Sequence, residues 1–239
     1  MVRQRVKKLI SYFLLFVSIV SISAIVILSY SPLTVFVQTQ IINSYHPIIV
    51  KEKKITPKLR KKNNWSTVKL LSFQNLLRES LHHSSRYIGA ILIPSLDINL
   101  PLANYTDDNI YTFGAGMLEP ENINSSNPLV IGAHNLGWKG SSALFTPIAF
   151  HRLYGRKVII TNFEEVKEFK ITSKKIIAPT NVKEVFKGTK NSLSLLTCTS
   201  NNKNRILVRA ELTKTYSARS LSSKFKRELS QKYRVNLAN

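Results

Sequence analysis

The sequence predicts a mostly β domain that closes into a barrel, carries a few short helices and follows one transmembrane helix. Three observations lead to this prediction. Residues 9–30 are uncharged, short segments rich in β-branched residues recur from Ile88 onward, and the 239-residue chain has room for one ordinary domain beside an anchor. Many short strands favour a closed barrel or a sandwich, because an open sheet would leave long unpaired edges.

The uncharged run at residues 9–30 is predicted to be a transmembrane anchor. At a helical rise of about 1.5 Å per residue it is long enough for a bilayer core of roughly 30 Å. A cleaved signal peptide is the alternative, since small residues at 21–24 offer a cleavage site, but the apolar run exceeds the usual limit of about 15 residues. Four basic residues precede it and Lys51 is the first positive charge after it. This asymmetry predicts a cytoplasmic N-terminus and an exported remainder.

The chain is divided into five segments. These are a basic cytoplasmic segment at 1–8, the transmembrane anchor at 9–30, a membrane-proximal linker at 31–65, the β-barrel domain at 66–213 and a basic C-terminal tail at 214–239. Residues 31–50 are also uncharged, so a second span returning the chain to the cytoplasm is an alternative. Polar residues and two prolines interrupt that stretch, which favours a connector.

Within the domain, an apolar stripe through Phe73, Leu76, Leu77 and Leu81 predicts a short helix. Seven strands are then expected, within the segments 88–94, 98–103, 127–133, 156–162, 168–179, 192–198 and 205–212. The tail has a weaker helical stripe, and a helix there would lie either on a membrane or on the surface of the domain.

The net charge of +22 is the compositional outlier, and it lies mainly in the flanking segments at 1–8, 51–62 and after 214. A basic excess suits nucleic acid, anionic lipid or an anionic wall polymer. Its position in the flanks favours an anionic membrane or wall polymer and disfavours nucleic acid as the partner. A purely solubilising role for this charge is the alternative.

Three residues with useful chemistry stand at predicted strand ends, where a barrel presents side chains to a groove. His134 follows the strand at 127–133, Cys198 ends the next-to-last strand and Arg205 opens the last one. Each alone has an ordinary structural explanation, and a lone cysteine is often a small buried apolar residue. Together they supply a nucleophile, a proton carrier and a permanent cation, which thiol acyl transfer requires.

The motifs around these residues resemble the class A sortases. The stretch LLTC ending at Cys198, with Arg205 on the following strand, resembles the sortase signature. Other segments resemble consecutive stretches of the family in the same order, namely VKLLSFQNLL, IPSLDINLPL, YTFGAGMLEP, NPLVIGAHN and FTPIAFHRLYGRKVII. Ser194 departs from the threonine that the family often has there. The resemblance covers roughly residues 66–212 and implies a sortase-type β-barrel.

The resemblance also implies the activity. Cys198 would attack the Thr carbonyl of an LPxTG-like signal in secreted proteins, His134 would transfer protons, and Arg205 would hold the oxyanion or the substrate backbone. The thioacyl enzyme would then pass to an amine of lipid II or peptidoglycan. Thr197 is expected to place the nucleophile or line the groove, and Thr180 to read the Leu-Pro end of the signal.

We expect neither a cofactor nor a metal. Some class A sortases bind calcium, and Glu119, Glu121 and Glu184 are the acidic residues that could do so here, but their surroundings are basic. Two other functions are alternatives. An L,D-transpeptidase would show a compact His-Gly-Cys motif, whereas Thr197 precedes Cys198. A membrane-tethered cationic protein that binds wall polymer or nucleic acid would explain the flanks but not the three residues at strand ends.

Overall fold

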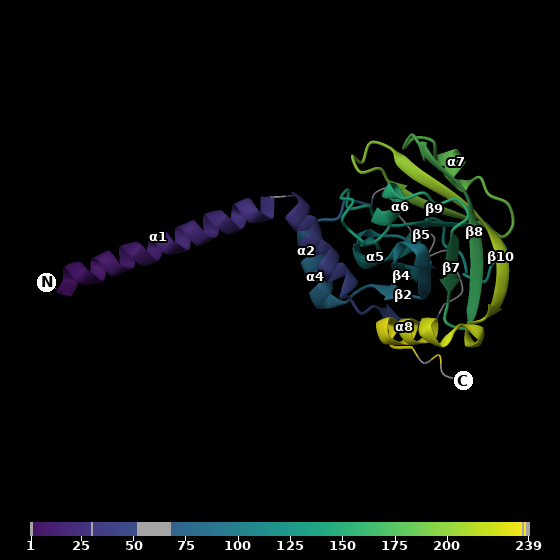
Figure 1. The fold of residues 1–239 in the computed structure, drawn as a ribbon, viewed down its shortest axis with the longest axis horizontal. Coiled ribbons are helices and arrows are strands. Elements are labelled where there is room, and N and C mark those ends of the chain that lie inside the picture. The colour runs from purple at the N-terminus through teal and green to yellow at the C-terminus, as the bar shows by residue number, and fades with distance from the viewer. Residues whose placement is uncertain (1, 30, 52–67, 236, 238–239) are drawn as a thin grey trace.

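The computed structural model describes residues 2–29, 31–51, 68–235 and 237 (Figure 1). Residues 52–65 of the predicted membrane-proximal linker lie outside these residues. The helix α1 (Val2–Ser29) projects away from a rounded domain. Its segment Arg5–Ile25 is apolar and long enough to cross a membrane, and it is wholly exposed in the structure. One N-terminal apolar helix therefore suggests a membrane anchor.

Eight strands form a closed barrel in the order β10-β8-β7-β3-β4-β5-β6-β9. Their bounds are β3 (Gly89–Ile93), β4 (Ile98–Ala103), β5 (Ala115–Met117), β6 (Leu129–Gly132), β7 (Lys157–Thr161), β8 (Glu165–Ile177), β9 (Ser192–Cys198) and β10 (Arg205–Ser217). The closed barrel and all seven expected strands are confirmed. The sequence did not predict β5, which has three residues, one of them glycine, and therefore too short an alternating pattern to detect.

Short helices lie between the strands and around the barrel. They are α2 (Ser31–Asn43), α4 (Phe73–His82), α5 (Asp108–Phe113), α6 (Thr146–Phe150), α7 (Val182–Phe186) and α8 (Ser223–Tyr233), with single 3₁₀ turns at Pro94–Leu96 and Ala218–Ser220. A further pair of two-residue strands, β1 (Ile48–Ile49) and β2 (Arg86–Tyr87), joins the segment after α2 to the domain. The helix expected from the Phe73 stripe is α4.

Alternation along the strands divides the apolar residues between the barrel interior and two outer faces. Inward-facing residues such as Ile91, Ile131 and Leu195 belong to one large buried core. On one outer face, Ala90 and Leu92 pack against α8. On another outer face, residues of β6, β8 and β10 pack against α7 in a smaller cluster that contains Leu118, Val130, Ile177, Val185 and Leu207.

The helix α8 lies on the surface of the domain, across one end of the barrel (Figure 1). Leu229 and Tyr233 on this helix are 1% and 2% exposed, and the Tyr233 hydroxyl hydrogen-bonds to the Asn99 side chain. Of the two locations considered for the tail, the domain surface is therefore the one observed. Burial of this apolar face against β3 and β7 explains why a helix with a basic outer surface is held here.

The helix α2 also packs on the domain, although the sequence suggested only a connector for these residues. Ile42 is 3% exposed within the main core, and the Thr39 hydroxyl lies 2.7 Å from that of Ser141. The Asn43 amide donates to Ser142 at 3.0 Å. These contacts bind the segment after α1 to the loop that precedes α6.

Replacing Ile42 by alanine should lower the free energy of unfolding by roughly 2–5 kcal/mol, because it leaves a cavity where α2 meets the core. Phe36 is the matched control, since it lies on the same helix and is 47% exposed, so Phe36→Ala should cost much less. Chemical unfolding of the full chain in detergent, followed by tryptophan fluorescence, measures both. Equal costs for the two variants would contradict the packing of α2.

Candidate active site

The strand β9 brings the three chemically useful residues together, because it lies between β6 and β10. It is parallel to β6, with Ile131 opposite Leu195 and Gly132 opposite Leu196. Parallel strands end at the same edge of a sheet, so the residues after Gly132 lie next to the end of β9. The strand β10 is antiparallel and begins where β9 ends, which places Arg205 directly opposite Cys198.

A tight loop at residues 199–204 fixes the pairing of Cys198 and Arg205. The backbone N–H of Thr199 donates to the Asn204 carbonyl at 3.0 Å, and Asn202 has a φ of 59°, in the left-handed region that Asn tolerates. Nη1 of Arg205 donates to the carbonyls of Asn202 and Asn204, each at 3.3 Å. A guanidinium has five N–H donors, so these two bonds leave capacity for a substrate oxygen.

Residues 133–137 hold His134 against the end of β9. The Asn135 side-chain amide donates to the Cys198 carbonyl at 2.8 Å, and its oxygen accepts from the Gly137 backbone N–H at 2.8 Å. On the other side, the His134 carbonyl accepts from the Phe145 N–H at 2.9 Å. The histidine is therefore fixed to the same backbone that carries the thiol.

Tyr111 of α5 covers the His134 ring. The two ring centroids lie 5.4 Å apart at 81°, an edge-to-face arrangement that aromatic rings favour. The tyrosine fits because residue 132 is glycine, where a Cβ would lie only 2.1 Å from the Tyr111 hydroxyl oxygen. This contact excludes water from one side of the imidazole.

The two threonines predicted to act on substrate differ in burial and in position relative to the cleft. Thr197 is 3% exposed and its hydroxyl donates to the Ala133 carbonyl at 2.8 Å, so it ties β9 to the residue before His134. It also contributes to the cleft lining. Thr180 is exposed in the loop between β8 and α7, next to the lining residue Pro179, but is not itself part of the lining.

One cleft of about 370 Å³ contains His134, Cys198 and Arg205. Its remaining lining is largely apolar and comes from the chain before α4, from α5, from the residues after β5 and β6, from β9, and from the β8–α7 region. The lining residues are Val68, Leu70, Tyr111, Leu118, Ala133, Ile177, Ala178, Pro179, Val182, Val185, Leu196 and Thr197. Larger hollows lie beside α2, but the chain's single cysteine is not in their lining. The apolar cleft suits a peptide with apolar side chains next to its reacting carbonyl.

Burial shifts the pKa values of His134 and Cys198 in opposite directions, and each shift favours the neutral form of the group. It lowers the pKa of His134 to about 4, with a smaller opposing effect from Asp108. Burial also raises the pKa of the Cys198 thiol, and the nearby Arg205 charge opposes this increase only in part. At neutral pH the resting pair is therefore mainly a neutral imidazole beside a neutral thiol.

Two of the three acidic residues considered for calcium, Glu121 and Glu184, make other contacts. The Glu121 carboxylate accepts from the Asn122 N–H at 2.9 Å and from the Asn127 side chain at 2.7 Å, while Glu184 pairs with Lys175. Within residues 2–29, 31–51, 68–235 and 237, no three His, Cys, Asp or Glu side chains group together as a metal site would require. Glu119 lies with Glu121 around a separate polar hollow.

Sequence reasoning assigned no role to Tyr111 and Asn135, which contact His134 and Cys198, or to Arg209, which hydrogen-bonds to carbonyls of α7. Asn135 directly follows His134 in a segment already singled out, so its position was a usable signal. Tyr111 resembles any other apolar residue of a short helix. Arg209 resembles an ordinary solvated charge on a strand, and its contacts with α7 depend on the fold.

Comparisons with known proteins agree with this geometry. A family model described as the sortase domain matches residues 91–213. Sortase A of Streptococcus agalactiae is 33% identical over 205 residues, which cover 82% of each chain. Sortase A of Listeria monocytogenes is 27% identical over 184 residues, covering 72% of this chain and 78% of the relative.

The crystal structure of Listeria monocytogenes sortase A superposes with a TM-score of 0.51 at 24% identity, covering 63% of this chain and 99% of the other, and this likeness supports the fold. The family match goes further, because residues 91–213 include most of the barrel and all three strand-end residues. The Streptococcus relative adds 33% identity over most of both chains. The chain therefore belongs to the sortase family, class A, whose members are cysteine transpeptidases that anchor LPxTG proteins to the cell wall.

Proposed function

We propose that Cys198, His134 and Arg205 together cleave an LPxTG-like sorting signal between Thr and Gly and transfer the protein to a cell-wall amine. The observation that carries this assignment is their convergence on one apolar cleft, from positions 64 and 7 residues apart along the chain. Cys198 is also the only cysteine, so no other thiol can be the nucleophile.

In the first half of the reaction the Cys198 sulfur bonds to the Thr carbonyl carbon while the thiol proton passes to His134. The carbonyl oxygen becomes negative, and Arg205 stabilises it with its permanent charge and planar donors. The C–N bond to glycine then breaks as the His134 imidazolium returns a proton to the departing amine. A thioacyl enzyme remains.

In the second half an amine attacks the thioacyl carbon. Neutral His134 accepts a proton from the attacking nitrogen, the C–S bond breaks and the proton returns to the sulfur. The low pKa of the buried imidazole keeps His134 neutral at neutral pH, so its lone pair is free to accept this proton. Lipid II or peptidoglycan is the amine donor that we propose.

The anchor places this chemistry at the outer face of the membrane. Arg5, Lys7 and Lys8 lie at the start of α1, and this positive flank supports a cytoplasmic N-terminus and an external catalytic domain. Secreted substrates and a lipid-linked amine then meet a tethered enzyme, which raises their effective concentration. The basic flanks are proposed to contact the anionic membrane or wall polymer rather than nucleic acid.

Cys198→Ala should abolish both cleavage and transfer, and Arg205→Lys should lower kcat/KM by about 10- to 100-fold while the domain stays folded. The reason is that lysine keeps the charge but lacks the planar fork of donors. Cleavage of a fluorescent LPxTG peptide, with and without a glycine-type amine, measures both steps. Lys203→Gln, which removes an exposed charge in the adjacent loop, is the control. Wild-type turnover by either active-site variant would refute the assigned roles.

Alkylation of Cys198 by iodoacetamide should follow a pH profile whose midpoint lies above the ordinary pKa of a cysteine thiol. Burial raises this pKa, and only the thiolate reacts. Arg205→Met should move the midpoint higher still, because the guanidinium charge favours the thiolate. A midpoint near or below neutrality would mean that the resting enzyme holds a stable thiolate, contrary to the burial seen here.

A further inference from the structure

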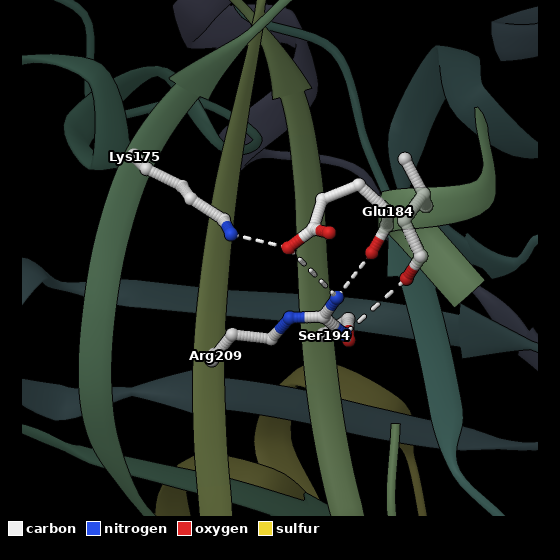
Figure 2. Close-up of polar contacts among 5 residues, drawn as sticks. Lys175, Glu184, Ser194 and Arg209 are labelled. Atoms are coloured by element: carbon white, nitrogen blue, oxygen red, sulfur yellow. Dashed lines mark hydrogen bonds and ion pairs between the residues drawn. The ribbon is translucent and has the colours of Figure 1, made fainter. Parts of the chain in front are cut away.

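A cluster of four polar side chains lies behind the wall of the catalytic cleft, and we call it the Arg209 clamp. It consists of Lys175 on β8, Glu184 on α7, Ser194 on β9 and Arg209 on β10 (Figure 2). Arg209 lies four residues after Arg205 on the same strand, so both point to the outer face of the barrel. The Arg209 side chain is only 17% exposed.

The Arg209 guanidinium joins three elements of the fold. Nη1 donates to the Ser194 hydroxyl and, at 3.3 Å, to the Val185 carbonyl, while Nη2 donates to the Glu184 carbonyl. Both carbonyls belong to the last turn of α7, where a positive charge is favourable, and the Glu184 carbonyl also accepts the Lys187 N–H at 3.4 Å. One side chain thus caps α7 and fastens it to β9 and β10.

The Glu184 carboxylate fastens the same helix to β8. It accepts a hydrogen bond from the Lys175 ammonium and lies 3.9 Å from Nη2 of Arg209. The hydrogen bond with Lys175 and the neighbouring positive charges hold the pKa of Glu184 below its ordinary value, so the carboxylate is charged at neutral pH. The helix is therefore held from two neighbouring strands, β8 and β10.

The opposite side of α7 forms the apolar wall of the cleft. Val182 and Val185 line the cleft, and Val185 is 4% exposed in the small cluster with Leu207. The paired residues of β9 and β10 form a ladder from the catalytic pair to the clamp, with Cys198 opposite Arg205, Leu196 opposite Leu207, and Ser194 opposite Arg209. The Ser194–Arg209 pair therefore lies four residue pairs along the ladder from Cys198 and Arg205, on the same face of the sheet.

We propose that the Arg209 clamp positions α7 and thereby determines how tightly the cleft binds the apolar residues of the sorting signal. The inference rests on the proposed function, since it takes this cleft as the peptide site. Arg209, Glu184 and Lys175 are positioning residues, because they act through Val182 and Val185 and do not line the cleft themselves.

Binding and chemistry should respond differently to loss of the clamp. A five-residue helix has little stability of its own, so its place depends on the contacts around it. The catalytic residues depend instead on the pairing of β9 with β6 and β10 and on the Asn135 hydrogen bonds. Releasing α7 should therefore weaken substrate binding and leave the chemical step nearly intact.

Arg209→Met tests the proposal, because methionine keeps an apolar stem and removes every donor. We expect KM for an LPxTG peptide to rise about tenfold with kcat changed less than about twofold, the effect of losing one or two charge-assisted hydrogen bonds. Discrimination between Leu and Ala at the first signal position should fall in parallel. Arg209→Lys should restore part of the affinity, since one ammonium can bind only some of the three acceptors.

A second pair of variants tests the proposal even if Arg209→Met fails to fold. Lys175→Gln and Glu184→Gln change side chains that are 46% and 24% exposed, and each should raise KM in the same direction by a smaller factor. Lys183→Gln is the matched control, because it removes the same charge from an exposed position on α7. Hydrogen exchange of the backbone amides at residues 182–187 should quicken in the clamp variants and stay unchanged in this control.

The outcomes separate this inference from the proposed function. Lower kcat at unchanged KM, or unchanged discrimination between Leu and Ala, would overturn the clamp as a determinant of binding. Failure of the wild-type enzyme to cleave any LPxTG peptide would refute the proposed function instead. In that case the hydrogen-exchange experiment still tests whether the clamp holds α7. Equal exchange at 182–187 in wild type and Arg209→Met would show that Arg209 does not hold this helix.

Discussion

The pairing of β9 between a parallel β6 and an antiparallel β10 is the constraint on which the site depends. It brings the chain after Gly132 to the end of β9 and sets Arg205 opposite Cys198. Hydrogen bonds from Asn135 and Thr197 then lock the two neighbouring backbones together. A register shift of one residue in β9 would turn Cys198 into the barrel interior, because successive side chains alternate between faces.

Burial of the site disfavours the charged forms that the reaction uses, the Cys198 thiolate and the His134 imidazolium. It raises the pKa of the thiol and lowers that of His134, so the resting groups are mainly neutral. Arg205 lies opposite the nucleophile in the sheet, and its charge favours the thiolate. In an apolar cleft its charge is also poorly screened by water, which strengthens its effect on a developing oxyanion.

Strand alternation predicted a barrel or a sandwich, and the resemblance to sortases favoured the barrel. The strand-end positions of His134, Cys198 and Arg205 were sufficient to predict that these three residues share a cleft. What the sequence could not provide came from contacts between distant segments. The uncharged stretch that forms α2 carries no local sign that Thr39 and Asn43 meet Ser141 and Ser142. Likewise, the role of Arg209 depends on hydrogen bonds to two backbone carbonyls of α7. Every residue has such a carbonyl, so the sequence does not indicate which ones Arg209 contacts.

The central claim is that the thiol, the imidazole and the guanidinium share one cleft and act on one carbonyl. Intact-mass spectrometry after rapid acid quenching of the enzyme with an LPxTG peptide, without added amine, tests it most directly. The account predicts an adduct that contains the signal through its Thr residue, mapped by proteolysis to Cys198. Cleavage without an adduct on Cys198, or an adduct on another residue, would contradict it.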